Sequence, residues 1–469
     1  MKNFTLLLLC LLLLATAGQA QTRVFPVDTL IKNGPLNRRI NLVFVGDGYQ
    51  STEMAKFRSD VDQMVADLFR TEPFNQYQRY FNVFAIRVPS VQSGTTHPRT
   101  ASDCNTAPNF PMGSNTTYFN TRFDNGGVHR AIVTGGQSAL AGVLATNFPL
   151  YTQAAVIVNT AEYGGTGGPV STITAHPSAS EICIHEIGHS FANLADEYWP
   201  GPQFANERPN RTQPAVIGSL RWQSWMGQNG IGNYAYPEDP TWSRPHQNCK
   251  MRYLNAPFCA VCVETIIERI HAGTRALESY TPATLTLNNP VQALPFSLNL
   301  LAPTPNTLKV TWKRDGVVFG GNTAQQTVPL SLLTPGNHTI RAEVLDTTTA
   351  SHSTSHRITH RYVVQWNIEN TVTSTSVSSS MAEYKVETFP NPVADRLNLA
   401  YTLPKPSEVR LTVLDAAGRR VKTISRGRQA AGTHTYELQS GELGLKQAGV
   451  YSLLLDIDGM VFSRQLVKE

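Results

Sequence analysis

The chain has 469 residues, about three times the length of a typical domain, so several domains are expected. Hydrophobic residues make up 41% of it and charged residues 16%, which allows packed cores and excludes a disordered polyelectrolyte. The 39 Lys and Arg exceed the 34 Asp and Glu by a net charge of only +5, without a basic block. Nucleic acid is therefore excluded as an expected partner.

A signal peptide is predicted at residues 1–20. Lys2 precedes a leucine-rich run at residues 6–14, and the small residues that follow end in Gly18-Gln19-Ala20, which is typical of a signal-peptidase site. The apolar run is shorter than the roughly 20 residues that a membrane anchor needs. We therefore expect an exported protein with no transmembrane segment in the mature chain.

The cysteines beyond this leader are odd in number, so at least one thiol is expected to stay unpaired. They are Cys104, Cys183, Cys249, Cys259 and Cys262. An oxidising compartment permits disulfides. Cys259-x-x-Cys262 could suggest zinc or a redox pair, but the sequence has no second Cys-x-x-Cys and Cys249 lies just upstream. We expect a local disulfide between Cys249 and one of that pair.

Strand and helix patterns alternate in residues 21–281, which predicts an α/β layered domain. The predicted strands are residues 40–45, 81–88 and 154–158, and the predicted helices are residues 52–69 and 137–146.

A β-sandwich of the immunoglobulin-like kind is predicted at residues 282–366, because short β-type runs recur there at regular spacing between turn residues. These runs are residues 308–313, 317–319, 327–332, 338–345 and 356–364. A Ser/Thr-rich linker is expected to follow at residues 367–385. A second all-β sandwich module is predicted at residues 386–469.

The sharpest chemical signal is His185-Glu186-Ile187-Gly188-His189. Ser178 and Glu181, which follow Pro177, form a capping-box pattern, so we expect a helix to begin there. Residues four apart on a helix share a face, so both imidazoles can bind one Zn²⁺. Glu186 would then act as the general base toward water.

The third ligand must come from the carboxylates that follow. Asp196 would lie about 10 Å beyond His189 on a straight helix, so the helix has to end before it. Asn193 is the residue best suited to the left-handed conformation that ends a helix. We favour Asp196 as the third zinc ligand, with Glu197 as the alternative; the other carboxylate would support a histidine or the turn. Tyr198 is expected to be a packing residue.

Cys249-Lys250-Met251-Arg252-Tyr253 resembles the methionine turn of metzincin-type metallopeptidases. The resemblance implies that Met251 supports the site from below without binding the metal. It also implies that Tyr253 could stabilise the oxyanion; the alternative is a core tyrosine.

Several motifs together resemble the M64 family of metallopeptidases, which is named for an immunoglobulin A peptidase. They are residues 41–49, 74–84 and 163–168, the zinc motif with Asp196-Glu197-Tyr198, Cys249-x-Met251, and Phe258-Cys259-x-x-Cys262. The resemblance implies a metzincin-like fold with a mixed sheet and a zinc helix. The chain departs from the metzincin pattern at Ala192, where a glycine is usual, and this leaves the third ligand open.

Two further features of this region allow two interpretations each. Asp47 follows the first strand and is expected to be a turn aspartate. The glycines of residues 163–168 either let a peptide pair with an exposed strand edge or form a flexible loop.

The C-terminal module resembles the sorting domain that the type IX secretion system of Bacteroidetes recognises. The resemblance rests on Pro390-Asn391-Pro392, Asp415-x-x-Gly418-Arg419, Gly449-Val450-Tyr451 and the terminal Lys468-Glu469. It implies that residues 386–469 bind this secretion machinery. The protein would then cross the periplasm and outer membrane of a Gram-negative bacterium and be secreted or attached to the cell surface.

The combined hypothesis is an exported zinc-dependent endopeptidase that hydrolyses peptide bonds of extracellular proteins. His185, His189 and Asp196 would hold Zn²⁺, Glu186 would serve as general base and Tyr253 would brace the oxyanion. The alternative is a non-catalytic adhesin of the cell surface, in which zinc is structural and the sandwich binds the ligand.

Overall fold

The structure is a computed structural model that describes residues 23–104, 112–217, 219–370 and 384–469. The predicted signal peptide and most of the predicted linker lie outside these residues. The chain divides into two compact units, and each is described by itself. The first comprises the residues up to 285 with 293–328 and 339–367; the second comprises 286–292, 329–338 and the residues from 368 onward.

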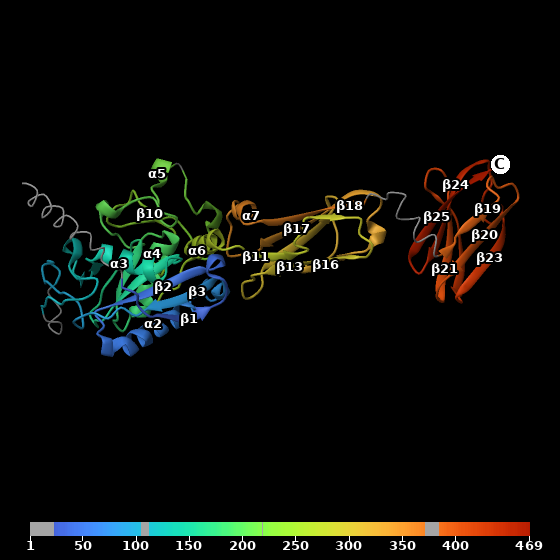
Figure 1. The fold of residues 1–469 in the computed structure, drawn as a ribbon. Helices are drawn as coiled ribbons and strands as arrows, with labels where there is room; N and C mark the ends of the chain where they lie inside the picture. Colours follow the sequence, from blue (N-terminus) through green and yellow to red (C-terminus); the bar gives the residue numbers. More distant parts are fainter. Residues whose placement is uncertain (1–22, 105–111, 218, 371–383) are drawn as a thin grey trace, which may run out of the picture. The chain divides into compact units, whose positions relative to one another are not determined.

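The first unit contains a mixed six-stranded sheet with the order β1-β3-β2-β6-β8-β7. Figure 1 labels β1, β2 and β3 of this sheet, drawn in blue. Its strands are β1 (Val27–Lys32), β2 (Ile40–Asp47), β3 (Phe81–Ile86), β6 (Gln153–Val158), β7 (Gly165–Thr166) and β8 (Val170–Thr174). The four central strands are parallel, and both edge strands, β1 and β7, run antiparallel to their neighbours.

Helices and short hairpins surround this sheet. The helices are α2 (Met54–Leu68), α3 (Gln137–Asn147), α4 (Ala179–Ala192), α5 (Pro214–Ile217) and α6 (Ala260–Gly273), and the hairpin strands are β4 (Thr121–Arg122), β5 (Val133–Thr134), β9 (Tyr234–Ala235) and β10 (Ser243–Arg244). The predicted strands and helices of this region all form, with ends that differ by a few residues.

Alternating side chains of β2 belong to two separate cores. Leu42 and Phe44 pack in one core with residues of α2, α4 and α6, whereas Val43 and Val45 pack in another core with residues of α3. Because successive side chains of a strand point to opposite faces, the sheet is covered on both faces. The result is a three-layer α/β arrangement, as predicted.

Helix α4 begins after Ser178, as expected, but without the expected capping box. In the described chain the Ser178 side chain makes no cap hydrogen bond. Glu181 instead accepts a hydrogen bond from Lys250 Nζ at 2.5 Å. This ion pair connects the first turn of α4 to the segment that carries Met251.

The first unit also contains most of a β-sandwich. Its strands are β11 (Leu277–Thr281), β13 (Leu294–Leu300), β14 (Leu308–Arg314), β15 (Val317–Val318), β16 (Gln325–Val328), β17 (Gly336–Asp346) and β18 (Tyr362–Asn370). β11 pairs with β13, so the first strand of the sandwich begins before the expected boundary at residue 282. Phe296, Trp312 and Trp366 pack together in its core, with ring centroids of Phe296 and Trp366 4.7 Å apart.

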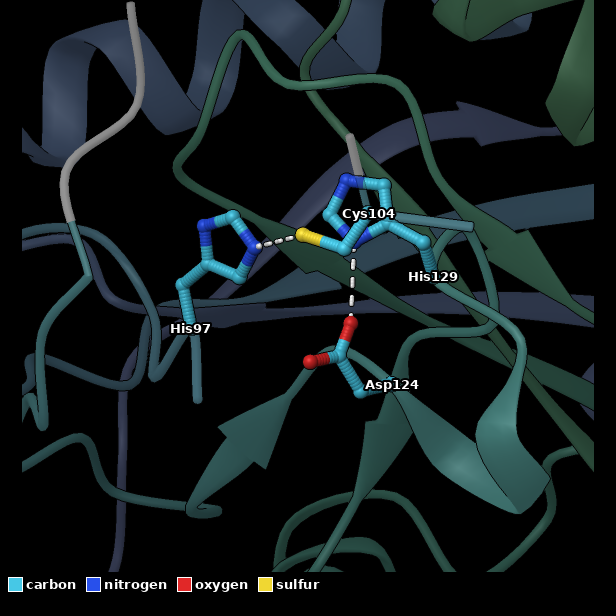
Figure 2. A group of neighbouring side chains, drawn as sticks. All are labelled: His97, Cys104, Asp124 and His129. Atoms are coloured by element: carbon cyan, nitrogen blue, oxygen red, sulfur yellow. Dashed lines mark hydrogen bonds and ion pairs between the residues drawn. The ribbon is translucent and has the colours of Figure 1, made fainter. Parts of the chain in front are cut away.

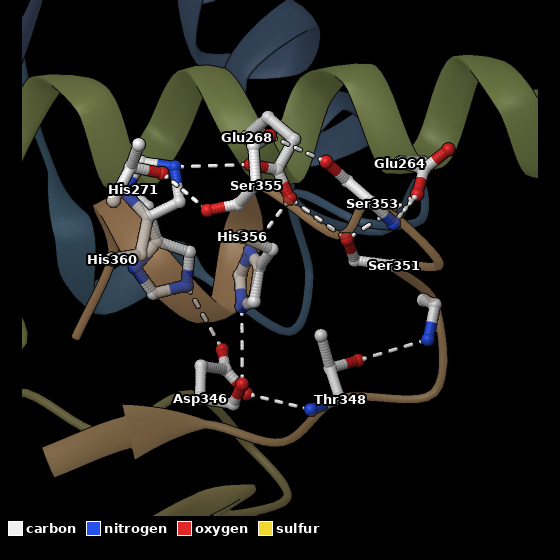
Figure 3. Close-up of polar contacts among 12 residues, drawn as sticks. Glu264, Glu268, His271, Asp346, Thr348, Ser351, Ser353, Ser355, His356 and His360 are labelled. Atoms are coloured by element: carbon white, nitrogen blue, oxygen red, sulfur yellow. Dashed lines mark hydrogen bonds and ion pairs between the residues drawn. The ribbon is translucent and has the colours of Figure 1, made fainter.

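The strand predicted at residues 356–364 is wrong at its start. Residues 356–359 form a helical turn, α7 (His356–Thr359). His356 is buried, and its Nδ1 lies 2.6 Å from Glu268 Oε1 while its Nε2 lies 3.0 Å from the Asp346 carbonyl oxygen. His360 Nε2 lies 3.0 Å from Glu268 Oε2. One helical turn therefore aims both imidazoles at α6 (Figure 3). Burial opposes the shift, but these imidazoles lower the pKa of Glu268 to about 2.

In the second unit, the C-terminal residues form two antiparallel sheets, one with the order β19-β20-β23 and one with the order β22-β21-β24-β25. The strands of this unit are β12 (Thr286–Asn288), β19 (Glu387–Phe389), β20 (Arg396–Leu403), β21 (Ser407–Leu414), β22 (Arg420–Gln429), β23 (Gly432–Gln439), β24 (Gly449–Ile457) and β25 (Met460–Lys468). Apolar residues from both sheets form one buried core, so the expected all-β module is present. Within the described residues, no helix is long and apolar enough to cross a membrane.

Asp47 has a larger role than the turn aspartate that was expected. It lies fully buried at the end of β2, and each of its carboxylate oxygens accepts a hydrogen bond from a backbone N–H. Oδ1 accepts from Phe119 N at 2.9 Å, and Oδ2 accepts from Thr121 N at 3.2 Å and from the hydroxyls of Thr117 and Thr121. The long segment after β3 is thus fastened to the end of the central strand.

Asp47→Asn is expected to lower the free energy of unfolding of the first unit by about 2–4 kcal/mol. The substitution keeps the size of the side chain, but either orientation of the amide directs its NH₂ group at a backbone N–H. Equilibrium urea unfolding followed by tryptophan fluorescence measures the change. Asp62→Asn, at a side chain of α2 that is 50% exposed, is the control and should stay within about 0.5 kcal/mol. Equal effects of the two substitutions would contradict this role of Asp47.

Candidate active site

The two histidines of α4 direct one ring nitrogen each toward a common point. His185 Nε2 and His189 Nε2 are 3.1 Å apart. The opposite nitrogens contact backbone carbonyl oxygens, His185 Nδ1 that of Lys250 at 2.9 Å and His189 Nδ1 that of Leu194 at 2.8 Å. Since a carbonyl oxygen only accepts, both Nδ1 atoms carry hydrogen, so the neutral form of each ring has its lone pair on Nε2, where a cation can bind.

The end of α4 brings a carboxylate to the same point. Asn193 has φ 56° and ψ 32°, the left-handed conformation that was expected there. Backbone hydrogen bonds close this turn, and the chain then returns past the helix. Asp196 Oδ1 lies 3.1 Å from His185 Nε2 and 3.2 Å from His189 Nε2. The structure therefore brings Asp196 to the two histidines, whereas Glu197 points into a different cluster.

These three side chains have the composition of a metal centre. Their ligand atoms all lie within 4.8 Å of one another. Although burial disfavours the charged forms, Asp196 raises the pKa of His189 to about 9, and the imidazoles hold the pKa of Asp196 well below its usual range. A positive charge between these three side chains, either a proton or a metal ion, is therefore favourable. Two imidazoles and a carboxylate form a donor set that suits Zn²⁺ and leaves a fourth position open.

Glu186 is buried beside this group and lacks a partner on one oxygen. Only 7% of the residue is exposed, and in the described chain its Oε2 has no hydrogen-bond partner. Burial raises the pKa of Glu186, and the neighbouring imidazoles oppose this shift. A buried carboxylate with a raised pKa and a free oxygen is suited to take up and release a proton.

The glycine-rich segment passes directly over Glu186. A Cβ at Gly165 would lie 3.1 Å from Glu186 Oε1, and a Cβ at Gly167 would lie 2.9 Å from Oε2. Larger residues at these positions would therefore press on the carboxylate. Gly165 belongs to β7, an edge strand of the sheet, and its N–H donates to the Arg130 carbonyl oxygen at 3.2 Å.

A pocket of about 290 Å³ opens in front of these residues. Besides His185 and Glu186, its lining includes Arg130, Tyr163 and Tyr198. Burial and the negative charge of Asp196 raise the pKa of Tyr198, which keeps its hydroxyl protonated as a hydrogen-bond donor. Tyr198 was expected to be a packing residue, and its place directly after Asp196-Glu197 is the sequence feature that could have indicated the pocket. Arg130 and Tyr163 carried no comparable signal.

Of the two residues that the methionine-turn resemblance singled out, Met251 is buried and Tyr253 is half-exposed. Met251 is fully buried, and its Sδ lies 2.7 Å from the position of a Cβ at Gly188, so it packs closely beneath α4. Tyr253 is 49% exposed and does not line the described pocket, whereas its neighbours Arg252 and Leu254 do. The Arg252 guanidinium lies 4.7 Å from the centroid of the Tyr253 ring.

The expected disulfide at Cys249 is wrong. All described cysteines are free thiols, and Cys249 Sγ lies 3.7 Å from Cys262 Sγ, far beyond the roughly 2.05 Å of a disulfide. Cys249, Cys259 and Cys262 instead surround one oxygen of Glu197. Sequence spacing alone does not reveal this arrangement, because Glu197 comes from a distant part of the chain.

A second polar cluster lies among residues that the sequence did not single out as a group. Figure 2 shows His97, Cys104, Asp124 and His129 directed toward one another. His129 places Nδ1 2.9 Å from Asp124 Oδ1 and Nε2 2.9 Å from Glu162 Oε1. Both ring nitrogens of His129 therefore have carboxylate partners, so this cluster is connected by hydrogen bonds.

Comparisons with known proteins identify two regions of the chain. Residues 29–230 match the family model described as IgA Peptidase M64, and residues 393–455 match that of the FlgD Ig-like domain. The first match supports the M64 resemblance and a peptidase activity. The second agrees with the all-β fold of the C-terminal module.

Similar solved structures cover only parts of the chain, and no curated protein matches it. FlgD from P. aeruginosa is 28% identical over 15% of this chain and 58% of its own, with a TM-score of 0.12. Latent PorU from Porphyromonas gingivalis is 13% identical over 41% of this chain and 20% of its own, with a TM-score of 0.16. Fibronectin(III)-like modules of CbhA from Clostridium thermocellum are 13% identical over 40% and 93%, with a TM-score of 0.15.

Proposed function

We propose that this protein is an exported zinc endopeptidase of the M64 family, with a metzincin-type active site. The observation that carries the proposal is the convergence of His185, His189 and Asp196 beside the buried Glu186, which lines a pocket and has one oxygen without a hydrogen-bond partner among the described residues. The match to the M64 family model supports the same activity.

His185, His189 and Asp196 are the residues that would hold the ion. Zn²⁺ bound there would supply a Lewis acid that polarises a carbonyl and acidifies water. The carbonyl oxygens of Lys250 and Leu194 keep both imidazoles in the tautomer that binds metal. Met251 fills the space beneath Gly188 and so keeps α4 in place.

Glu186 performs the proton transfer in this proposal. It accepts a proton from the attacking water and later delivers it to the departing amine nitrogen of the cleaved peptide bond. Its burial suits this role, because a raised pKa brings the proton affinity of the carboxylate closer to that of its partners.

Tyr198 takes the role that the sequence assigned to Tyr253. Its protonated hydroxyl belongs to the pocket lining, where it can donate a hydrogen bond to the oxyanion that forms on the scissile carbonyl. Tyr253 is half-exposed and outside that lining, which favours a surface role.

A peptide substrate would bind in extended form along β7. Among the described residues this edge strand has no neighbouring strand on its outer side, although the Gly165 N–H already donates to the Arg130 carbonyl oxygen at 3.2 Å. The strand passes over Glu186, and its glycines allow close approach of another backbone. Backbone pairing does not require chain ends, so the arrangement favours cleavage within a protein chain.

Glu186→Gln is expected to lower kcat for peptide hydrolysis by at least about 10²-fold while the zinc content stays unchanged. The amide keeps the shape of the side chain but cannot take up the proton. Cleavage of a denatured protein and metal analysis measure the two effects, and a chelator should abolish the wild-type activity.

Glu238→Gln, at an exposed glutamate, is the matched control and should keep full activity. His189→Ala should lose both zinc and activity. Proteolysis at the wild-type rate by Glu186→Gln would refute the proposal.

Tyr198→Phe is expected to lower kcat by about 10-fold or more with little change in KM, because the hydrogen bond to the oxyanion is lost, together with the contact of the hydroxyl with Asp196. Tyr253→Phe is the matched variant and should leave kcat within about twofold. Steady-state kinetics on one fluorogenic peptide tests both. A larger loss of kcat in Tyr253→Phe than in Tyr198→Phe would assign the stabilisation of the oxyanion to Tyr253.

Export by the type IX secretion system belongs to the proposal as well. The motifs of residues 386–469 support it, and so does the predicted signal peptide. Removal of residues 386–469 is expected to retain the protein in the periplasm of a Bacteroidetes host, as cell fractionation and immunoblotting would show. Normal appearance of the truncated protein outside the cell would contradict this assignment.

A further inference from the structure

The cluster of Glu197, Cys249, Cys259 and Cys262 has no part in the proposed hydrolysis. All four side chains are buried, and their ligand atoms lie within 4.8 Å of one another. Glu197 accepts a hydrogen bond from Asn210 Nδ2 at 3.1 Å on Oε1, whereas its buried Oε2 has no partner among the described residues. A cluster of this kind without a cation would leave polar groups in the core poorly satisfied.

From this geometry we infer that Cys249, Cys259, Cys262 and Glu197 bind a second, structural Zn²⁺. The donor set is closed, with four protein ligands, as structural zinc sites are. Binding would release the thiol protons to solvent and leave three thiolates on the ion.

The distances fit a tetrahedron of ligands. With Zn–S bonds of about 2.3 Å and Zn–O bonds of about 2.0–2.2 Å, tetrahedral edges are about 3.8 Å between sulfurs and about 3.5 Å between sulfur and oxygen. Cys249 Sγ and Cys262 Sγ are 3.7 Å apart. Glu197 Oε1 lies 3.4 Å from Cys262 Sγ and 3.8 Å from Cys259 Sγ.

The surroundings compensate the negative charge of such a site. Cys259 is the N-cap residue of α6 and Cys262 lies in its first turn, where the helix dipole favours negative charge. The backbone N–H of Cys259 donates to Cys249 Sγ at 3.4 Å. Arg244 is buried near Glu197, so that their charges interact.

The second ion would position the first site. Glu197 follows Asp196 directly, and Cys249 lies two residues before Met251. Glu197 N also donates to the Met251 carbonyl oxygen at 2.7 Å. A cation that joins Glu197 to Cys249 and α6 would therefore hold Asp196 and Met251 in register beneath α4.

Cobalt substitution in the purified full chain tests this inference independently of activity. After zinc is removed and Co²⁺ added, we expect thiolate-to-cobalt charge-transfer absorption in the near ultraviolet, which a site of imidazoles and carboxylates does not produce. His185→Ala, which disrupts the catalytic site, should retain the absorption. Cys104→Ser, the matched control outside the cluster, should retain it too.

Cys259→Ser should lose most of the absorption and one equivalent of tightly bound zinc per chain. If Cys259→Ser does not fold, two measurements on the wild type and on His185→Ala test whether the cluster binds metal. They are the charge-transfer absorption and the alkylation of the cluster thiols. In both proteins, the cluster thiols should resist alkylation until a chelator is added, and then react without a reductant. Absence of the charge-transfer absorption, its loss in Cys104→Ser, or a disulfide among Cys249, Cys259 and Cys262 would overturn the inference. An inactive enzyme that keeps the absorption would refute only the proposed hydrolysis.

Discussion

The left-handed conformation of Asn193 is the constraint on which the candidate active site depends. It ends α4 just after His189, and the following residues turn back along the helix. The Leu194 carbonyl oxygen then reaches His189 Nδ1, and Asp196 reaches both Nε2 atoms. Without this turn a continuous helix would carry Asp196 about 10 Å away from the imidazoles.

The same turn separates two adjacent carboxylates into different environments. Asp196 faces the histidines at the pocket, whereas Glu197 points into the core toward the cysteines. Their neighbour Tyr198 returns to the pocket lining. These three consecutive residues thus face the pocket, the core and the pocket again, so a shift of the segment by one residue would exchange the surroundings of Asp196 and Glu197.

Much of this arrangement follows from local sequence patterns, and the remainder depends on contacts between distant segments. Helix periodicity predicts the shared face of His185 and His189, and the residue type of Asn193 predicts the end of the helix. The cysteine cluster could not be predicted, because Glu197 meets the cysteines only through folding. The one turn of helix at His356 was likewise missed, since it contacts Glu268 on α6, which is distant in the sequence.

In the long segment after β3, the residues that Asp47 anchors are different from the residue that lines the pocket. The carboxylate holds Phe119 and Thr121 by their backbone N–H groups, and the hydroxyls of Thr117 and Thr121 add two further hydrogen bonds. Arg130, farther along the same stretch of chain, lines the pocket. Under the proposed peptidase function, side chains near the pocket such as Arg130 can therefore vary while the Asp47 anchor stays constant, a division that favours the evolution of new cleavage preferences.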